Sequence, residues 1–277
     1  MNAGMRDFTL RNVYITGGSA GIGLAVARQM AKRGANIIVF ARTRHKLEAA
    51  LREVQRERVS SDQRFGYRVL DVCEHAMVQA VMGEAAQTFG PPGVLINCAG
   101  RAIPHAFEDI PFTQFDETLR INLYGTWNTV AALVPAMYAA GGSIVNVASM
   151  AAFMGVFGYS DYCASKFGVL GLSEVLRQEL RRYGISVHVL CPPDTDTPGF
   201  AVENLTKPPE TKAISAGARI MTADEVARAL IRVMERGRFM IIPGLEGKLA
   251  YFMKRHFPTV LDLMMKTTIR KAQMTPT

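Results

Sequence analysis

Residues 12–23 read Asn12-Val-Tyr-Ile-Thr16-Gly-Gly-Ser-Ala-Gly-Ile-Gly23, a strand-like run followed by a glycine-rich turn. The first five residues are typical of a buried strand, and the turn opens directly into a stretch of helical period. Such a turn lets backbone N–H groups approach a phosphate, whose charge the helix N-terminus favours. A glycine motif alone could be a structural turn. Here the strand before it, the helix after it and a second strand beyond favour a dinucleotide-binding βαβ unit.

The rest of the chain continues this alternation of short β-branched runs and longer helical stretches, which indicates a parallel sheet. We therefore predict an α/β fold, a Rossmann-type doubly wound parallel sheet of seven strands and six crossovers. The expected strands are Asn12–Thr16, Asn36–Ala41, Phe65–Val72, Val94–Asn97, Ser143–Ala148, Ser186–Cys191 and Phe239–Ile242. The expected helices are Ile22–Arg33, His45–Val59, Glu74–Phe89, Phe112–Ala139, Asp161–Arg182 and Ala223–Arg236. The segment Ala201–Ile220 has no strand character, and we expect an inserted loop or lid there.

Composition excludes several classes of protein. The 277 residues are 49% hydrophobic and 20% charged, which is not the composition of a collagenous, disordered or disulfide-scaffold protein. Lysine and arginine number 32 against 24 acidic residues, and the net charge of +8 favours anionic partners such as nucleotides or phospholipid surfaces. The four cysteines form no CxxC pair, so we expect buried free thiols in a reducing compartment and no metal site.

Two segments bear on membranes. Ile121–Ser160 contains no acidic or basic residue, but asparagines, glycines and a proline interrupt it. We therefore expect a buried helix, a central strand and a loop at the site, and not a membrane span. Met1–Arg11 has no apolar stretch long enough for a signal peptide, and we expect a cytoplasmic protein.

The end of the second expected strand indicates the cofactor. An NAD-binding protein places a carboxylate there against the ribose 2′-hydroxyl, whereas this chain has Ala41, Arg42 and, further on, Lys46. Without a carboxylate to repel it, a 2′-phosphate can be bound bidentately by the Arg42 guanidinium. The alternative is two solvated cations at a helix start. The sequence favours NADP(H).

Four polar residues predict a catalytic site. Tyr162 and Lys166 are spaced i and i+4, on one face of a helix. A free tyrosine has a pKa near 10, and a neighbouring ammonium lowers it, so Tyr162 is a candidate general acid for a reduced carbonyl. Ser149 follows a strand at the carboxyl edge of the sheet, where ligands bind, and could hold the substrate oxygen. Asn122 could support Lys166 through a water.

Together with the glycine loop, Asp71-Val72 and Asn97-Cys98-Ala99-Gly100, these residues resemble the short-chain dehydrogenase/reductase family over roughly residues 8–245. The resemblance implies that Tyr162 is the proton donor and acceptor and that Ser149 positions the carbonyl. It also implies that Lys166 binds the nicotinamide ribose and lowers the pKa of Tyr162, with Asn122 completing a tetrad. The implied cofactor-binding residues are Gly17, Ser19, Ala20, Gly21, Ile22, Arg42, Lys46, Asp71, Val72, Asn97, Ala99, Gly100, Tyr162, Lys166, Pro192, Thr195 and Thr197.

A narrower resemblance comes from residues 191–200, which read CPPDTDTPGF. With the downstream pairs Glu203-Asn204, Lys207-Pro208 and Ile214-Ser215, this run is similar to the 3-ketodihydrosphingosine (3-ketosphinganine) reductases. The resemblance implies NADPH-dependent reduction of the 3-keto group of 3-ketosphinganine to sphinganine, with the following loop shaping a long-chain pocket. Eukaryotic members carry an N-terminal membrane anchor that we do not find in this sequence, which leaves the mode of membrane contact open.

The C-terminal part is basic and amphipathic. Lys248–Lys271 carries six basic residues and one acid, and its apolar residues recur at helical spacing around Pro258. Such a segment can lie on an anionic membrane, on the cytoplasmic face, or pack on the body or a partner subunit. We divide the chain into a reductase domain at residues 1–245, which includes the catalytic site, and a tail at residues 246–277.

Three functions remain open from the sequence. The first is a 3-ketosphinganine reductase, whose partners would be a long-chain keto-lipid and an anionic membrane surface. The second is a reductase of another ketone, such as a 3-oxoacyl thioester, a steroid or a polyol. The third is a non-catalytic nucleotide sensor, against which the complete set of four polar residues argues. We expect a homo-oligomer, a dimer or a tetramer, and no nucleic-acid partner.

Overall fold

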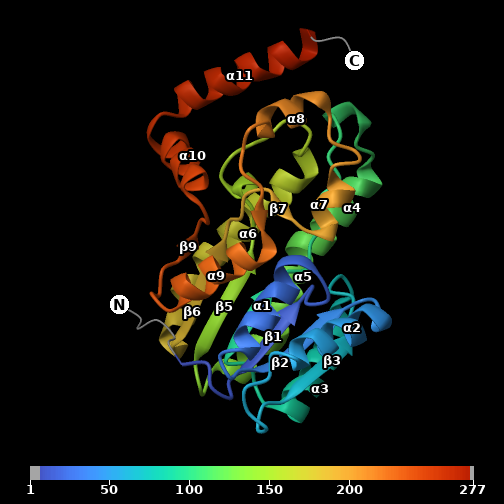
Figure 1. The fold of residues 1–277 in the computed structure, drawn as a ribbon, viewed down its shortest axis with the longest axis vertical. Helices are drawn as coiled ribbons and strands as arrows, with labels where there is room; N and C mark the ends of the chain where they lie inside the picture. Colours follow the sequence, from blue (N-terminus) through green and yellow to red (C-terminus); the bar gives the residue numbers. More distant parts are fainter. Residues whose placement is uncertain (1–6, 275–277) are drawn as a thin grey trace.

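Seven parallel strands form one sheet in the order β3-β2-β1-β4-β5-β6-β9 in the computed structural model, which describes residues 7–274 (Figure 1). This confirms the predicted doubly wound parallel sheet. The expectation for Met1–Arg11 falls outside the described residues at positions 1–6. The outer ends of the predicted reductase domain and tail, at positions 1–6 and 275–277, also lie outside them. The strands are β1 (Asn12–Thr16), β2 (Asn36–Ala41), β3 (Phe65–Val69), β4 (Val94–Asn97), β5 (Gly142–Val147), β6 (Ile185–Leu190) and β9 (Met240–Ile241).

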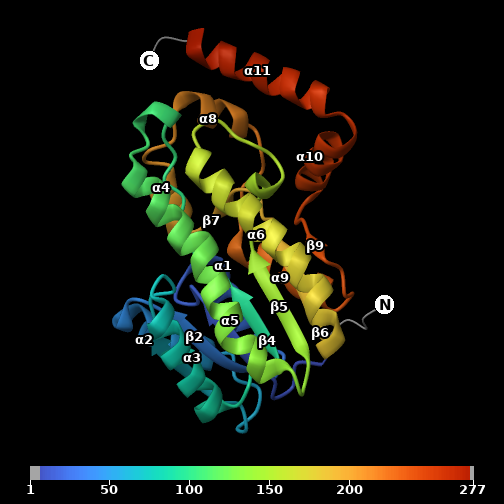
Figure 2. The same cartoon turned by 180° about the vertical axis from the view of Figure 1, so that it is seen from behind.

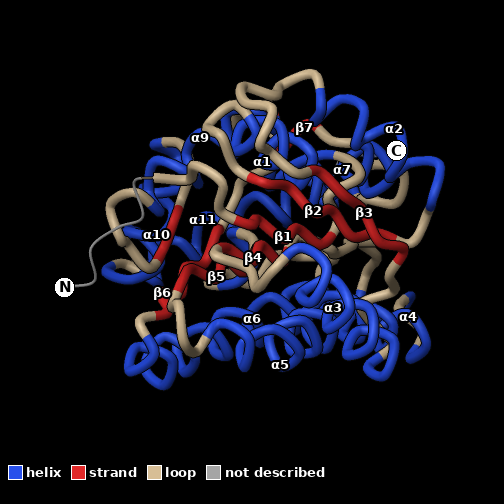
Figure 3. Tube along the Cα trace, turned by 90° about the horizontal axis from the view of Figure 1, so that it is seen from below, coloured by secondary structure: helices blue, strands red, loops and turns tan. Residues whose placement is uncertain are grey.

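Helices cover both faces of the sheet, and each face has its own apolar core. Figure 3 shows α1, α2 and α9 on one side of the strands and α3, α5 and α6 on the other. One core includes Val26 of α1, Leu47 of α2 and Leu230 of α9, and the other includes Met82 of α3 and Leu133 of α5. The helices are α1 (Gly21–Ala31), α2 (Arg44–Gln55), α3 (His75–Phe89), α4 (Phe112–Leu119), α5 (Gly125–Met137), α6 (Ser160–Glu179), α7 (Pro198–Glu203), α8 (Pro209–Ser215), α9 (Ala223–Met234), α10 (Leu245–His256) and α11 (Pro258–Met274).

The order of the strands reverses between β1 and β4. Thr16, the last residue of β1, lies opposite Phe40 on one side and Asn97 on the other, so three strands end side by side. Ligands of open α/β sheets bind in the crevice beyond such a point, because the loops leave it in opposite directions. The fold therefore brings the loops after β1, β2, β4 and β5 to one edge.

The chain between Phe112 and Ala139 differs from the single helix we expected. It forms α4, one π-helical turn at Arg120–Tyr124, and then α5. A π-turn inserts one extra residue per turn without changing composition, so the apolar pattern does not reveal it. The charge-free segment Ile121–Ser160 forms α5, β5 and the loop beyond, as expected.

The segment expected to be a loop or lid contains two short helices, α7 and α8. The Thr197 hydroxyl accepts the Phe200 N–H at the start of α7, and Pro209 occupies the first turn of α8. A two-stranded parallel pair, β7 (Thr195–Asp196) and β8 (Met221–Thr222), joins the two ends of the segment. We call residues 197–220 the lid.

The C-terminal residues form α10 and α11, with the expected break at Pro258. Tyr251 of α10 packs edge-on against Phe153, with ring centroids 5.0 Å apart, and α11 packs on α8. Figure 2 shows α11 crossing over α8 at the end of the molecule opposite α2 and α3. Within residues 7–274, no helix is both long and apolar enough to cross a membrane.

Candidate active site

The glycine loop between β1 and α1 is folded closely against neighbouring backbone. Gly17 has a φ of +65°, and a Cβ there would lie 2.8 Å from the Ala99 nitrogen. Gly21 has a φ of +54°, and its Cβ would lie 3.1 Å from Cγ2 of Thr197. Because L side chains rarely adopt this backbone and a Cβ would crowd its neighbours, both positions favour glycine. The loop thus lies between the end of β4 and the base of the lid.

The first turn of α1 can take an anion. Ala20 precedes the helix in an extended conformation and brings no side-chain cap, so the first backbone N–H groups are not covered by a capping oxygen. With Ser19 and Ile22 on either side, this is the arrangement in which a helix N-terminus binds a pyrophosphate. The residues present fit the phosphates of a dinucleotide.

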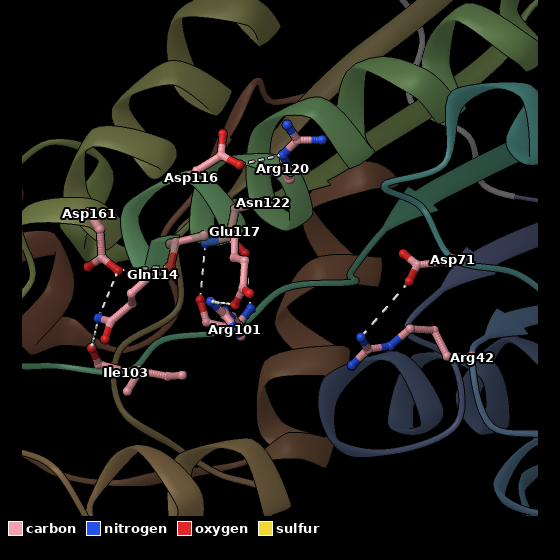
Figure 4. Close-up of polar contacts among 11 residues, drawn as sticks. Arg42, Asp71, Arg101, Ile103, Gln114, Asp116, Glu117, Arg120, Asn122 and Asp161 are labelled. Carbon is pink, nitrogen blue, oxygen red and sulfur yellow. Dashed lines mark hydrogen bonds and ion pairs between the residues drawn. The ribbon is translucent and has the colours of Figure 1, made fainter. Parts of the chain in front are cut away.

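The carboxyl end of β2 presents Arg42 to the end of β3, as Figure 4 shows. The Arg42 guanidinium is 69% exposed and lies 4.0 Å from the Asp71 carboxylate. Lys46 is also exposed, on the first turn of α2, whereas Val72 is buried in the core. Arg42 and Lys46 can therefore reach a 2′-phosphate. Val72 can contribute only an apolar surface against which the cofactor packs.

Asn97, which we expected to bind cofactor, has its side chain in a buried polar network. Its Nδ2 donates to Oδ1 of Asn146 at 2.9 Å, and its Oδ1 accepts the Thr129 hydroxyl at 2.7 Å. The Thr16 hydroxyl in turn accepts the N–H groups of Cys98 and Ala99 at 3.1 and 3.3 Å. The network joins β1, β4, β5 and α5 and holds the backbone beside the glycine loop, so a cofactor role for Asn97 stays a prediction.

Ser149, Tyr162 and Lys166 come together at the carboxyl end of β5. The Ser149 side chain lies next to the Tyr162 phenol, and Lys166 Nζ lies 5.5 Å from the centre of the Tyr162 ring. Lys166 Nζ donates to the Val147 carbonyl oxygen at 2.9 Å. The residues on β5 and α6 thus meet as the sequence spacing led us to expect.

Burial dominates the proton affinities of this group. It raises the pKa of Tyr162 above its ordinary value of 10.0, and the hydrogen bond from Ser149 opposes that rise. Burial lowers the pKa of Lys166 to about 8, because removal from solvent disfavours the charged ammonium. Tyr162 is therefore protonated at neutral pH and able to donate. The expected lowering of its pKa by Lys166 stays a prediction.

Asn122 lies in the π-turn between α4 and α5 and is buried. Its Oδ1 accepts the Arg101 N–H at 2.9 Å, and its Nδ2 donates to the Arg101 carbonyl at 3.0 Å (Figure 4). Nδ2 also donates to the Ser165 hydroxyl at 2.9 Å. A Cβ on Gly100 would lie 3.0 Å from Asn122 Oδ1 and 3.4 Å from Lys166 Nζ. Asn122 and Lys166 thus border the same glycine, and Asn122 fixes the chain after β4.

The loop after β6 lies over the same edge. The Met150 N–H donates to the Pro192 carbonyl oxygen at 3.2 Å, and the Thr195 hydroxyl donates to the Pro193 carbonyl at 2.7 Å. With Thr197 against Gly21, this loop connects the Ser149 segment with the glycine loop. Cofactor contacts from Pro192, Thr195 and Thr197 stay predictions.

Sequence reasoning missed Asp161, which holds the start of α6. Its fully buried carboxylate accepts the Tyr162 N–H at 2.7 Å, the Thr118 hydroxyl at 2.8 Å and the Gln114 amide at 3.1 Å. Figure 4 shows Gln114 also reaching Ile103 on the loop after β4. Asp161 thus sets the position of Tyr162. An acidic residue in the first turn of a helix was the available signal.

A second missed group joins the lid to the site. Lys207 pairs with Asp194 at 3.3 Å and with Glu203 at 3.1 Å, and the Tyr159 hydroxyl donates to Glu203 at 2.5 Å. Glu203 and Lys207 are spaced i and i+4, which could have suggested the pair, but Asp194 and Tyr159 come from other segments.

The cysteines are not reactive groups of this site. Cys163 and Cys191 are buried as expected, whereas Cys73 and Cys98 are only half-buried, because they lie on loops at the sheet edge. Burial raises the pKa of Cys98 to about 11 and that of Cys191 to about 12. A protonated thiol is a poor nucleophile.

Comparison with known proteins agrees with this geometry. The family model for short chain dehydrogenases matches residues 11–208, and the chain belongs to that family of oxidoreductases. It is 37% identical over 238 residues to the 3-dehydrosphinganine reductase of Danio rerio and to the 3-ketodihydrosphingosine reductase of Bos taurus, covering 85% of this chain and 72% of each relative. Among solved structures it resembles levodione reductase, with a TM-score of 0.77, 27% identity and coverage of 87% of this chain and 99% of that one.

Proposed function

We propose that the protein reduces the 3-keto group of 3-ketosphinganine, with NADPH as the reductant, and so forms sphinganine. The observation that carries the chemistry is the meeting of Ser149, Tyr162 and Lys166 beside a phosphate-binding glycine loop. The observation that carries the substrate is the identity to 3-dehydrosphinganine reductases over most of the chain. The same site on another ketone is the alternative.

The residues around the site would hold the cofactor at both ends. The glycine loop and the first turn of α1 would bind the pyrophosphate, and Arg42 with Lys46 would bind the 2′-phosphate. Lys166 would bind the nicotinamide ribose. The bound dinucleotide supplies a hydride to the carbonyl carbon.

Three side chains then have separate tasks. Ser149 donates a hydrogen bond to the ketone oxygen and holds it next to the Tyr162 hydroxyl. Tyr162 gives its proton to that oxygen as negative charge develops there, so the product is an alcohol. Lys166, 5.5 Å from the ring, stabilises the phenolate that remains. Asn122 and Asp161 keep these groups in place.

The substrate is tested by comparing ketones on purified protein. We expect NADPH oxidation with 3-ketosphinganine to have a kcat/KM at least tenfold above that with a 3-oxoacyl thioester of equal chain length. Sphinganine should appear in equal amount to the NADPH consumed. A preference for the thioester would show that the assigned substrate is wrong, while the proposed reduction of a ketone by NADPH would still hold.

We also propose that the tail contacts an anionic membrane peripherally, on the cytoplasmic side. Leu249, Phe252 and Leu263 are exposed on α10 and α11, together with Lys266 and Arg270. One side of α11 is engaged by α8, so packing on the body and contact with lipid use different sides of the tail. An apolar side with nearby cations is what interfacial helices use. A long-chain lipid would be collected from that surface.

We further propose that the protein forms a homo-oligomer through the layer of α5 and α6. Trp127 on α5 and Phe167 and Val175 on α6 are exposed on this layer. Where such residues form a contiguous patch they mark interaction surfaces, and this layer is therefore our candidate. Sedimentation of the wild type beside Trp127→Glu would report the assembly, and we expect the variant to dissociate.

A further inference from the structure

A charged cluster links the lid to the loop that precedes the catalytic helix. We define it as Tyr159, Asp194, Glu203 and Lys207. Lys207 Nζ lies 3.1 Å from Glu203 and 3.3 Å from Asp194, and it also lies 4.2 Å from the centre of the Phe200 ring. Asp194 lies in the run 191–200, Glu203 and Lys207 lie in the pairs that follow it, and the proposed chemistry uses none of the three.

The cluster carries one negative charge in excess. Two carboxylates share one ammonium, and the Tyr159 hydroxyl is neutral. The Lys207 side chain is only 3% exposed, whereas those of Glu203 and Asp194 are 17% and 32% exposed. A buried charge is costly unless it is paired. The excess negative charge therefore favours the binding of a cationic group on the solvent-exposed side of the two carboxylates.

The excess charge lies near the reacting centre. The Tyr159 ring centroid is 5.6 Å from that of Tyr162. Burial raises the pKa of Tyr162 most, and the negative charges of Glu203 and Asp194 add to the rise. The Glu203 carboxylate is thus joined to the catalytic tyrosine through a single side chain, that of Tyr159.

We infer that Glu203 and Asp194 bind the ammonium group that the substrate carries on the carbon next to its ketone, and this inference rests on the proposed function. In 3-ketosphinganine the amine is on C2 and the ketone on C3, so the nitrogen is about 2.5 Å from the carbonyl carbon. A pair of carboxylates one side chain away from Tyr162, through Tyr159, suits a cation carried on the carbon next to the ketone. Lys207 sets their spacing, and Tyr159 orients Glu203. These are specificity residues for an α-amino ketone.

A cluster that only fastens the lid would behave differently. One carboxylate would suffice to neutralise Lys207, and loosening the lid would impair every ketone to the same extent. Ammonium binding instead predicts a loss confined to substrates that carry the cation. Comparing two ketones that differ only in that group separates the two explanations.

The experiment uses the full-length protein, saturating NADPH and two substrates. These are 3-ketosphinganine and the same long-chain hydroxyketone with hydrogen in place of the amino group. An amine beside a carbonyl is largely protonated below about pH 7.7, so the assay is run under that pH. We expect the wild type to prefer the amine at least tenfold in kcat/KM.

Glu203→Gln keeps the size of the side chain and an oxygen that accepts from Tyr159, but it removes the charge. We expect its KM for the amine to rise at least tenfold, with kcat and the KM for the amine-free ketone within about twofold of wild type. Glu210→Gln, which removes the same charge from α8 of the lid outside the cluster, should change neither KM. Asp194→Asn should act in the same direction as Glu203→Gln.

The outcomes are distinct. Equal wild-type kcat/KM for the two ketones would overturn ammonium recognition while leaving the proposed reductase function intact, and it requires no variant to fold. An equal rise of both KM values in Glu203→Gln would also overturn it and make the cluster a lid fastener. Failure of the wild type to reduce either ketone would overturn the proposed function and this inference with it.

Discussion

Replacing Arg42 with alanine separates recognition of the 2′-phosphate from the rest of cofactor binding. The Arg42 side chain is 69% exposed. Its ion pair with Asp71, at 4.0 Å, is too long and too exposed to solvent to fix the position of the guanidinium. Arg42 is therefore free to turn toward a phosphate. Because most of its side chain is exposed, the variant should fold normally.

The expected loss of NADPH affinity can be set from the contact that is removed. A hydrogen bond to a charged group contributes about 1.5–3 kcal/mol, and the exposure of Arg42 favours the lower half of that range. About 2 kcal/mol corresponds to roughly a 30-fold higher Kd. The Asp71 carboxylate, left without its cationic neighbour, would repel the phosphate and act in the same direction.

The assay is titration of NADPH and NADH by fluorescence for wild type, Arg42→Ala and Asp71→Asn. Asp71→Asn is the matched control, because its amide oxygen can still accept the Cys73 N–H that Asp71 accepts at 3.0 Å. We expect Arg42→Ala to weaken NADPH alone, whereas a contact of Asp71 with the part that both cofactors share would make Asp71→Asn weaken NADPH and NADH equally. Equal weakening of both cofactors by Arg42→Ala would refute the assignment.

Three further predictions concern pH, stability and lipid. Because burial lowers the pKa of Lys166 from 10.5 to about 8, the unfolded chain binds that proton more tightly between these values. The free energy of unfolding of wild type relative to Lys166→Met should therefore rise with pH across this window, by up to about 3 kcal/mol in urea titrations, and a constant difference would contradict it. Asp161→Ala removes the acceptor of the buried Thr118 hydroxyl and of the Tyr162 N–H, while Gln114 keeps the Ile103 carbonyl, and it should cost about 3 kcal/mol by the same measurement, more than Asp161→Asn. Reversing Lys266 and Arg270 to glutamate should weaken co-sedimentation with anionic vesicles at least tenfold, since each cation near such a surface contributes about 1 kcal/mol; unchanged binding would argue against lipid contact.

The strands could be predicted because both faces of the sheet are covered. Buried strands are continuous apolar runs, and the bounds of β1, β2 and β4 are those expected from the sequence. Tyr162 and Lys166 could be paired because they share one helix, where spacing alone sets their relation. Ser149 followed from its place at the end of a strand.

The missed features depend on contacts between distant segments. The π-turn that carries Asn122 is a change in hydrogen bonding with no signal in composition. The lid helices are short, and Lys207 fastens them through Asp194, a residue outside them. Nothing local predicts that α11 lies on α8, because its apolar residues would suit lipid equally well.

The proton transfer assigned to Tyr162 is the centre of the account, and Tyr162→Phe tests it most directly. The variant keeps the ring and loses only the hydroxyl that Ser149 contacts. We predict that the Kd for NADPH is unchanged and that kcat with 3-ketosphinganine falls by about 10²-fold or more, the scale for removing a general acid. A Tyr162→Phe protein that reduces 3-ketosphinganine at near the wild-type rate would contradict it.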